Sequence, residues 1–352
     1  MIPRTTRMVG VEPLREFMER LLRAAGCGPE AASTAAAVFL EADLRGVGLQ
    51  GLDHMHTMIR NLQTGRINPH GKPRIAAEGE AFALVDGDTA PGQVAGVYAV
   101  QVLTRKAATA GCCAAGVVNS SDMFMLGYYA ERIARAGFVG LVFSDAPPLV
   151  RPFGGTQRIL GSNPLAIAIP TAADDPILLD MATSAQSGSR VRQAAYHDED
   201  IPEADGVGPD GRPSVKASEV LQGAIGPGSY KNFGLALCVA LLSGPLVGAA
   251  TGTALADWHK AAPGRASSKG HLFVALNPAA FGDPGTFRSR VSAYVQEVKS
   301  SRRAPGVSEI LVPGEREFAR RARSLREGVA IYEAVWRNIS ALAAGLGVSM
   351  PA

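Results

Sequence analysis

Cysteine and charge are both scarce in this 352-residue sequence. The four cysteines form no CxxC pair and no cluster with histidine at the spacing of a zinc site, so we expect neither a metal site nor a disulfide. Charged residues make up 19% of the chain, the net charge is only +3, and no segment is dense in Lys or Arg. This composition argues against a nucleic-acid-binding protein.

Long apolar runs are scarce as well. The best candidate, residues 233–250, is interrupted by glycines and a proline, so we expect no stretch of the roughly 18 apolar residues that a membrane span needs. The first seven residues lack the apolar stretch of a secretory signal. We therefore expect a cytoplasmic protein that does not contact a membrane. With 47% hydrophobic residues, the chain can bury one large core or two ordinary ones.

The common nucleotide and hydrolase motifs are also missing. The sequence has no GxGxxG opening a helix, no P-loop, no HExxH and no GxSxG elbow. These absences disfavour a standard dinucleotide fold, a P-loop enzyme, a zinc protease and a serine hydrolase. A search for known motifs therefore indicates nothing more specific than a soluble α/β enzyme.

The pattern of apolar residues changes along the chain. Residues 11–26, 30–45 and 52–62 have the helical spacing of three and four, whereas from residue 69 onward short strands and helices alternate, which is typical of an α/β core. The segment 199–213 is rich in Asp, Pro and Gly and is predicted to be an exposed loop. From about residue 287 the pattern is helical again. We predict an N-terminal helical lobe (1–75), an α/β domain (76–285) and a C-terminal helical segment (286–352) that packs with the N-terminal lobe.

Three polar junctions follow candidate strands, where α/β proteins place ligands. They are Asn119–Asp122, Ser144–Pro148 and Asp180–Ser184. Each taken alone could merely cap a helix or form a turn, but three together favour a shared cleft. A glycine-rich segment, 226–234, then precedes an apolar helix and contains Lys231; it could bind an anion or be a solvated surface loop.

Nine segments, in order and spanning nearly the whole chain, resemble the type-2 malate/L-lactate dehydrogenase family, which includes lactate, malate, sulfolactate and ureidoglycolate dehydrogenases and a cyclic-imine reductase. The segments are Glu41–Gly46, Gly65–Pro69, Asp86–Asp88 with Gly92–Val94, Asn119–Ser120 with Gly127–Arg132, Leu160–Ala168, Leu179–Ser184, Lys231–Ala236, Gly270–Phe273 and Pro313–Arg316.

The resemblance implies an α/β, sulfolactate dehydrogenase-like fold that binds NADH or NADPH without a Rossmann fingerprint, with a helical lobe built from both chain ends. It also implies a homodimer that acts on a small molecule. Carried over position by position, the cofactor-binding set is Ser144, Pro147, Asp180, Met181, Ala182, Lys231, Gly270, His271, Gly314, Glu315 and Arg316.

The sequence departs from the family on the substrate side. The family motif Ser-His-Gly-x-x-Arg is replaced by Leu49, Gln50 and, at the arginine position, His54, so the usual fork that holds a substrate carboxylate is predicted to be lost. Asp122 stands where the family has its catalytic histidine, and an unperturbed aspartate is a poor acid near neutral pH. The predicted catalytic set is Asp122, His54, Gln50 and Ser120.

These departures disfavour ordinary 2-hydroxy acid oxidation. The leading hypothesis is NAD(P)H-dependent reduction of a C=N bond of a non-standard, biosynthetic substrate, with Asp122 as an electrostatic partner of an iminium and a histidine as proton relay. A second possibility is reduction of a C=O bond, with Asp122 buried and its pKa raised so that it serves as an acid. The alternative is a non-redox isomerase, cyclase or lyase, or an inactive dinucleotide-binding scaffold.

Overall fold

A mixed seven-stranded sheet forms the centre of the protein, seen here in a computed structural model that describes residues 5–255 and 268–351. The strand order is β2-β3-β4-β10-β5-β6-β7. Their bounds are β2 Arg74–Glu78, β3 Phe82–Asp86, β4 Cys112–Ser120, β10 Lys269–Leu276, β5 Val139–Ser144, β6 Leu165–Ile169 and β7 Ile177–Met181. Strand β10 follows β4 and β5 by more than 120 residues in the sequence but lies between them and pairs antiparallel with both. This pairing brings residue 269 beside the end of β4.

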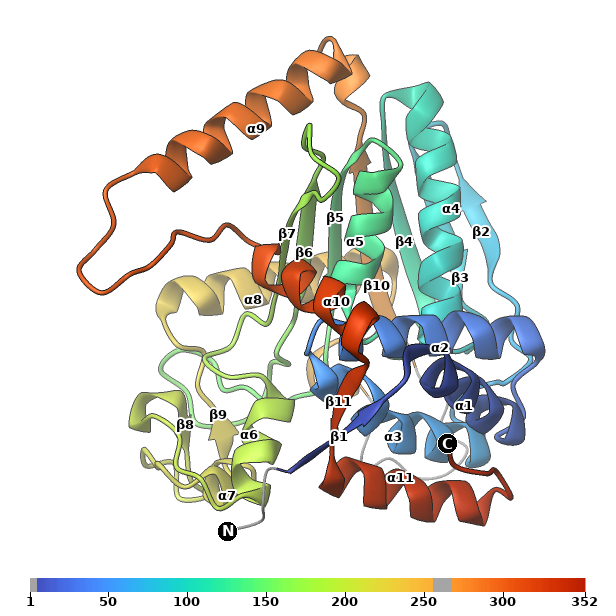
Figure 1. The fold of residues 1–352 in the computed structure, drawn as a ribbon, viewed down its shortest axis with the longest axis vertical. Coiled ribbons are helices and arrows are strands. Elements are labelled where there is room, and N and C mark those ends of the chain that lie inside the picture. Colours follow the sequence, from blue (N-terminus) through green and yellow to red (C-terminus); the bar gives the residue numbers. More distant parts are fainter. Residues whose placement is uncertain (1–4, 256–267, 352) are drawn as a thin grey trace.

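Helices α4 (Gly92–Ala110) and α5 (Leu126–Arg135) pack on one face of the sheet (Figure 1). Their apolar sides meet the sheet in a core that contains Leu103, Tyr129 and Phe273, all fully buried. Helix α8 (Tyr230–Ser243) packs against β5 and β10. The alternation of strands and helices predicted from residue 69 onward is confirmed, because the apolar residues of each helix face the same sheet.

Both ends of the chain build a helical lobe at one end of this sheet. Helices α1 (Val11–Ala24), α2 (Pro29–Leu44), α3 (Leu52–Gln63) and α11 (Glu333–Gly345) share one core, in which Phe17 lies against Trp336 with ring centroids 6.5 Å apart. Strand β1 (Thr6–Val9) pairs antiparallel with β11 (Val329–Tyr332). The predicted fold class, with a lobe from both termini, is confirmed; the exact domain boundaries stay a prediction.

Two short strands of this lobe were missed. Residues 6–9 and 329–332 carry little strand signal because each is only four residues long and is flanked by helix. Their pairing joins residues that lie more than three hundred positions apart in the sequence, as in Thr6 with Tyr332. Local sequence patterns contain no information on such a partner.

The segment from 188 to 225 forms a small third cluster. It contains α6 (Gly188–Tyr196), α7 (Ala217–Val220) and the paired strands β8 (Gly206–Val207) and β9 (Ala224–Ile225). Val191, Ile201 and Val220 are buried in the core of this cluster. The prediction of an exposed loop over 199–213 is therefore wrong in part, because a few apolar residues fold its polar turns onto α7.

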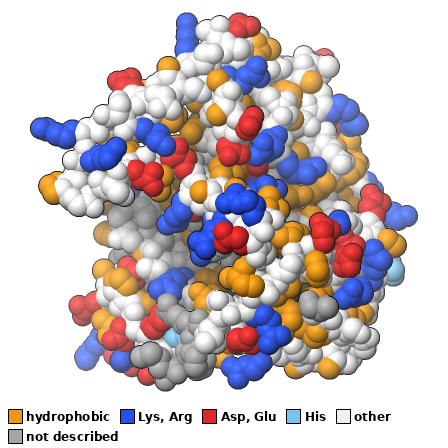
Figure 2. All heavy atoms as spheres, viewed as in Figure 1, with side chains coloured by type: hydrophobic (Ala, Val, Ile, Leu, Met, Phe, Trp, Pro, Cys, Tyr) orange, Lys and Arg blue, Asp and Glu red, His pale blue; other side chains and the backbone are white. Residues whose placement is uncertain are grey.

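Helix α9 (Pro284–Ser300) lies at the end of the molecule opposite the helical lobe (Figure 1). None of its residues is buried, and Lys and Arg side chains gather over it and the segment that follows (Figure 2). After it, residues 301–314 return the chain to α10 (Glu315–Glu327), which packs against α2. The predicted C-terminal segment 286–352 thus joins the lobe only through α10, β11 and α11.

One described segment, Tyr230–Val247, is long and apolar enough to cross a membrane by length and composition, with a mean hydropathy of 1.4. The prediction that no such stretch exists is therefore wrong. A core helix can pass the same test, and α8 within this segment buries Ala236, Val239 and Ala240. By itself the segment is weak evidence for a span.

Candidate active site

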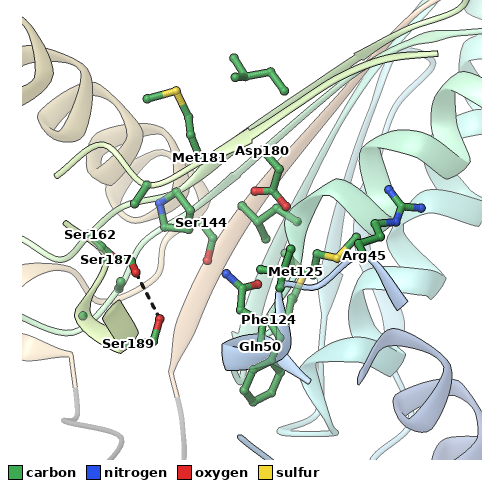
Figure 3. A pocket seen from close by; sticks show the side chains of 18 of the residues that line it. Arg45, Gln50, Phe124, Met125, Ser144, Ser162, Asp180, Met181, Ser187 and Ser189 are labelled. Carbon is green, nitrogen blue, oxygen red and sulfur yellow. Dashed lines mark hydrogen bonds between the residues drawn. The ribbon is translucent and has the colours of Figure 1, made fainter. Parts of the chain in front are cut away.

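A cavity of about 660 Å³ lies between the helical lobe, the ends of β4, β5 and β7, the start of α6 and the start of α10. In Figure 3, Gln50 of the helical lobe lies near Phe124 and Met125, which come from the segment between β4 and α5. Ser187 and Ser189 lie on the opposite wall. All three polar junctions predicted from the sequence contribute to it. The contributing residues are Asp122, Ser144, Asp145, Ala146, Pro147, Asp180, Met181 and Ala182.

Asp122 forms an ion pair with Lys269 on the wall of this cavity. The Lys269 side chain is only 4% exposed, whereas that of Asp122 is 25% exposed. Asp122 comes from the segment after β4 and Lys269 from the first residue of β10, so the pairing of these two strands brings them together. Lys269 was not among the predicted site residues, and no motif marks it; it immediately precedes the recognised segment Gly270–Phe273.

His271 lies beneath this pair and is fully buried. Burial and the positive charge of Lys269 lower the pKa of His271 to about 3, so the ring is neutral. Its Nε2 lies 3.1 Å from the carbonyl oxygen of Ser121, which can only accept, and its Nδ1 lies 2.9 Å from Ser144 Oγ. Nε2 therefore carries the proton and Nδ1 accepts from the hydroxyl. His271 thus orients Ser144 at the cavity wall.

Asp145 is a further carboxylate at the cavity that sequence reasoning did not single out. It is 1% exposed, accepts a hydrogen bond from the Thr251 hydroxyl, and accepts another from the backbone N–H of Ala146 at 2.9 Å. Burial raises its pKa, and these two hydrogen bonds and the charge of Lys269 oppose that rise. Lys269 therefore lies in the field of two carboxylates, Asp122 and Asp145.

The helical lobe contributes Gln50 and His54 to the cavity. Gln50 ends the short helix η1 (Gly48–Gln50), its carboxamide points into the cavity in Figure 3, and its Oε1 is buried with no hydrogen-bond partner among the described residues. His54 meets the edge of Phe124, with ring centroids 5.5 Å apart. Phe124 also packs on Phe39 at 4.7 Å. Phe124 thus adds aromatic bulk to the cavity wall; it stands at the glycine position of the motif Asn-Ser-Asn-His-Phe-Gly, which is typical of the family that the sequence resembles.

Asp43 holds the loop that carries Gln50. Its carboxylate accepts the backbone N–H of Leu52 at 2.8 Å, and a Cβ added to Gly51 would lie 2.2 Å from Asp43 Oδ1. Burial raises the pKa of Asp43 to about 8. The loop is therefore fixed by a buried and largely protonated acid, and it has no room for a side chain at Gly51.

Asp180 lies at the end of β7 and lines the cavity. Burial raises its pKa to about 6, although the N–H of Gly127 donates to it at 2.7 Å and the charge of Arg45 favours the ionised form. Arg45 is itself held by Glu41 at 2.7 Å and by Glu131. Asp180 itself is exposed at the cavity, whereas the side chains of Arg45, Glu41 and Glu131 are mostly buried and tie α2 to α5 beside it.

Helix α10 begins at the cavity. Gly314 precedes it with φ +96°, and a Cβ there would lie 3.0 Å from the Cβ of Leu178. Gly314 and Arg316 both line the cavity, and the Arg316 side chain is 80% exposed. A left-handed glycine at this point allows the helix N-terminus to approach β7.

Five predicted site residues do not line this cavity: Ser120, Lys231, Gly270, His271 and Glu315. Ser120 and His271 are fully buried, and Lys231 is exposed with its ammonium 6.0 Å from the Tyr230 ring centre. A Cβ at Gly270 would lie 2.0 Å from the carbonyl oxygen of Ser243. Glu315 pairs with Lys299 and accepts the N–H of Val312 at 3.0 Å. Their assignment to the site stays a prediction.

The family model described as malate/L-lactate dehydrogenase matches residues 9–340. This chain belongs to that family. A relative named malate dehydrogenase from Pyrococcus horikoshii is 33% identical, with 95% of this chain and 94% of the relative covered. The chain is an oxidoreductase of the malate/L-lactate dehydrogenase family, whose dehydrogenases use NAD(H) or NADP(H).

Solved structures agree with this membership. Malate dehydrogenase from Entamoeba histolytica superposes with a TM-score of 0.93 at 25% identity, covering 99% of this chain and 100% of that one. Delta1-piperideine-2-carboxylate reductase from Pseudomonas syringae pathovar tomato superposes with a TM-score of 0.86 at 28% identity, covering 96% and 100%. The same fold therefore occurs in enzymes named for different substrates.

The cavity fits a dinucleotide in this family member. Its volume of about 660 Å³ lies in the range of cofactor sites, and one wall is built from backbone and small residues such as Pro147, Ala182 and Gly314. The start of α10 presents backbone N–H groups that suit a phosphate, although Glu315 and Glu317 in its first turn oppose an anion. Ser144, Asp180, Met181 and Arg316 complete the residues that would hold it.

Proposed function

We propose that this chain is an NAD(P)H-dependent reductase of a C=N or C=O bond in a substrate other than a simple 2-hydroxy or 2-oxo acid. The observation that carries the proposal is the Asp122–Lys269 ion pair on a cavity wall that has Gln50 and His54 in place of the family's histidine and arginine. When bound, the dinucleotide supplies the hydride.

The cavity supports loss of the usual carboxylate clamp. His54 contacts the edge of Phe124 and cannot present the two parallel N–H groups of a guanidinium. Phe124 and the buried Met123 add bulk beside it. A substrate held mainly through apolar contacts, with Gln50 as a hydrogen-bonding group, fits this wall better than a small dicarboxylate does.

Among the two bond types, C=N is the leading candidate. The neighbouring structure from Pseudomonas syringae is named for reduction of a cyclic imine carboxylate, so the fold accommodates this chemistry. The pairing with Lys269 alters the role expected of Asp122, because a carboxylate paired with an ammonium is a weaker partner for an iminium cation. The pair suits a neutral imine or carbonyl, which needs a proton as well as a hydride.

The test is a substrate panel with NADPH and NADH. Δ1-piperideine-2-carboxylate, Δ1-pyrroline and a bulkier cyclic imine form one arm; pyruvate and oxaloacetate form the other; an aryl ketone without a carboxylate forms the third. We expect turnover of an imine or of the ketone. Turnover of the 2-oxo acids alone would refute the proposal.

The alternative is a non-redox enzyme or a dinucleotide-binding scaffold on the same fold. A fluorescence titration with NADH and NADPH separates the cases. Binding without turnover on any panel member would favour the scaffold, and no binding would point to a non-redox enzyme. Asp180 and Gly314 on the proposed cofactor wall support the reductase over a non-redox enzyme, and turnover separates the reductase from the scaffold.

We also propose the predicted homodimer. The described surface carries an apolar side of α8 and of the short helix η3 (Pro245–Val247) after it: Tyr230 and Leu241 of α8 are 64% and 50% exposed, and Leu246 of η3 is 64% exposed. A second copy would remove this area from water. Light scattering on Leu241→Glu, compared with the unaltered chain, tests it; an unchanged dimer would exclude this side of α8 as the interface. The cytoplasmic location stays a prediction.

A further inference from the structure

Lys269 occupies a position that the backbone defines tightly. The register of β10 against β4 shifts between Lys269 and His271, and such a bulge redirects the side chain beside it. At the intervening Gly270, a Cβ would lie 2.0 Å from the carbonyl oxygen of Ser243, so β10 passes too close to the end of α8 for any other residue. The Lys269 side chain is consequently placed beside the segment after β4.

Lys269 Nζ contacts the carboxylate of Asp122, and the residue lines the cavity. Asp122 pairs with it, Asp145 lies within its electrostatic range, and the neutral His271 adds no competing charge. The side chain is 4% exposed, so little water surrounds the ammonium. An ammonium has three N–H donors, and Asp122 oxygen accepts one, which leaves donors for a ligand in the cavity.

We propose that Lys269 is a catalytic residue of this reductase and donates the proton that the substrate nitrogen or oxygen takes up. This inference rests on the proposed function above. The C=N or C=O π bond breaks: its carbon forms a C–H bond with the hydride, and its heteroatom forms an N–H or O–H bond with the proton from Nζ. The substrate gains two electrons, which NAD(P)H loses, and Nζ regains a proton from water.

Asp122 then acts as a positioning residue. Its carboxylate accepts one N–H of the Lys269 ammonium and holds the charged side chain at the cavity wall, so the other two N–H groups stay available to a ligand. The pair together replaces the single histidine of the family motif.

The decisive comparison is between Lys269→Arg and Lys269→Met. Arginine keeps the ion pair with Asp122 but does not release a proton at accessible pH, whereas methionine removes both functions. With the fastest-reduced member of the panel, we expect both variants to lose about 10²-fold or more in kcat. KM and the NADPH affinity should change less than about threefold in Lys269→Arg, because charge and volume on that wall are retained.

Lys106→Arg is the matched control. Lys106 also forms an ion pair, with Glu78 at 2.7 Å, and its side chain is 16% exposed, but it lies on α4 outside the cavity. Its kcat should be unchanged. If Lys269→Arg retains kcat within about threefold of the unaltered chain, Lys269 serves only the ion pair and the proposal is wrong.

A second measurement applies if Lys269→Arg does not fold. Added ethylammonium should raise the kcat of Lys269→Ala at least tenfold over its value without the amine. The increase should follow the fraction of the amine that is protonated. Restoration independent of protonation, or none at all, would overturn proton donation. If the unaltered chain reduces nothing on the panel, the proposed function itself fails, which is a different result from retained activity in Lys269→Arg.

Discussion

The two sides of the cavity are lined by different types of residue. The side proposed for the cofactor includes small residues such as Pro147, Ala182 and the left-handed Gly314. The side proposed for the substrate consists of long or aromatic side chains: Gln50, His54, Asp122, Phe124 and Lys269. The chemistry of the second wall changes with each substitution, because its side chains supply the charged and polar groups. The departures from the family motif lie on the second wall.

The largest expected effect comes from restoring the family histidine. In Asp122→His, the buried Lys269 loses its carboxylate and imine reduction should fall by about 10²–10⁴-fold in kcat. Pyruvate and oxaloacetate should remain unreduced because His54 cannot clamp a carboxylate. NADPH affinity, measured by fluorescence, should stay within about threefold because the cofactor wall is untouched. A gain of 2-oxo acid reduction would contradict the division between the two walls.

Asp43→Asn should change the dependence of stability on pH. The folded pKa of about 8 exceeds the ordinary 3.8, so the folded state holds a proton that the unfolded state releases above pH 4. The stabilisation that the protonated Asp43 carboxyl gives the fold is fully present below pH 3.8 and is lost as pH rises through 8. It amounts to on the order of a few kcal/mol.

Urea unfolding at pH 5 and pH 8 measures this effect. The fall in the free energy of unfolding over that range should be smaller in Asp43→Asn than in the unaltered chain, because asparagine can still accept the N–H of Leu52 without titrating. Equal falls in both proteins would mean that Asp43 is ionised in the fold. His271 has the opposite effect on the acid side. Because its folded pKa is about 3 against an ordinary 6.5, the free energy of unfolding falls as pH drops below 6.5.

Gly314→Ala should weaken dinucleotide binding about tenfold by displacing the start of α10. The matched control is Gly137→Ala, since Gly137 has almost the same φ (+95° against +96°) but nothing within 4 Å of an added Cβ. Both variants should lose about 1 kcal/mol of stability to backbone strain. Only Gly314→Ala should alter the fluorescence titration, and equal affinity in the two variants would remove α10 from the cofactor site.

The smallest expected effect concerns the choice of cofactor. In Arg316→Ala, NADPH affinity should fall by about three- to tenfold and NADH affinity should not change, if Arg316 meets the 2′-phosphate. Arg323→Ala is the control, because Arg323 lies on the same helix, is 72% exposed and pairs with Glu327 at 2.6 Å, outside the cavity. An equal loss for both dinucleotides would place Arg316 near the shared pyrophosphate.

Sequence reasoning located the cavity better than its detailed chemistry. The polar junctions at strand ends were predicted because strand ends of one sheet meet at a common edge. Lys269 was missed because a lysine in a short polar stretch is usually solvated, and nothing local distinguishes a buried one. Asp145 lay within the predicted junction Ser144–Pro148 but was not named as a site residue. Lys231, conversely, was favoured by its neighbouring glycines but lies outside the cavity.

What the sequence by itself determined is the family, the α/β class and the substitution of the substrate-side motif, since each depends on residue identity and spacing along the chain. What only the tertiary structure decided is which charges meet. Asp122 and Lys269 are 147 positions apart, and they pair because β10 inserts between β4 and β5. Electrostatic energy depends on distance in space and on burial, and neither can be read from local sequence.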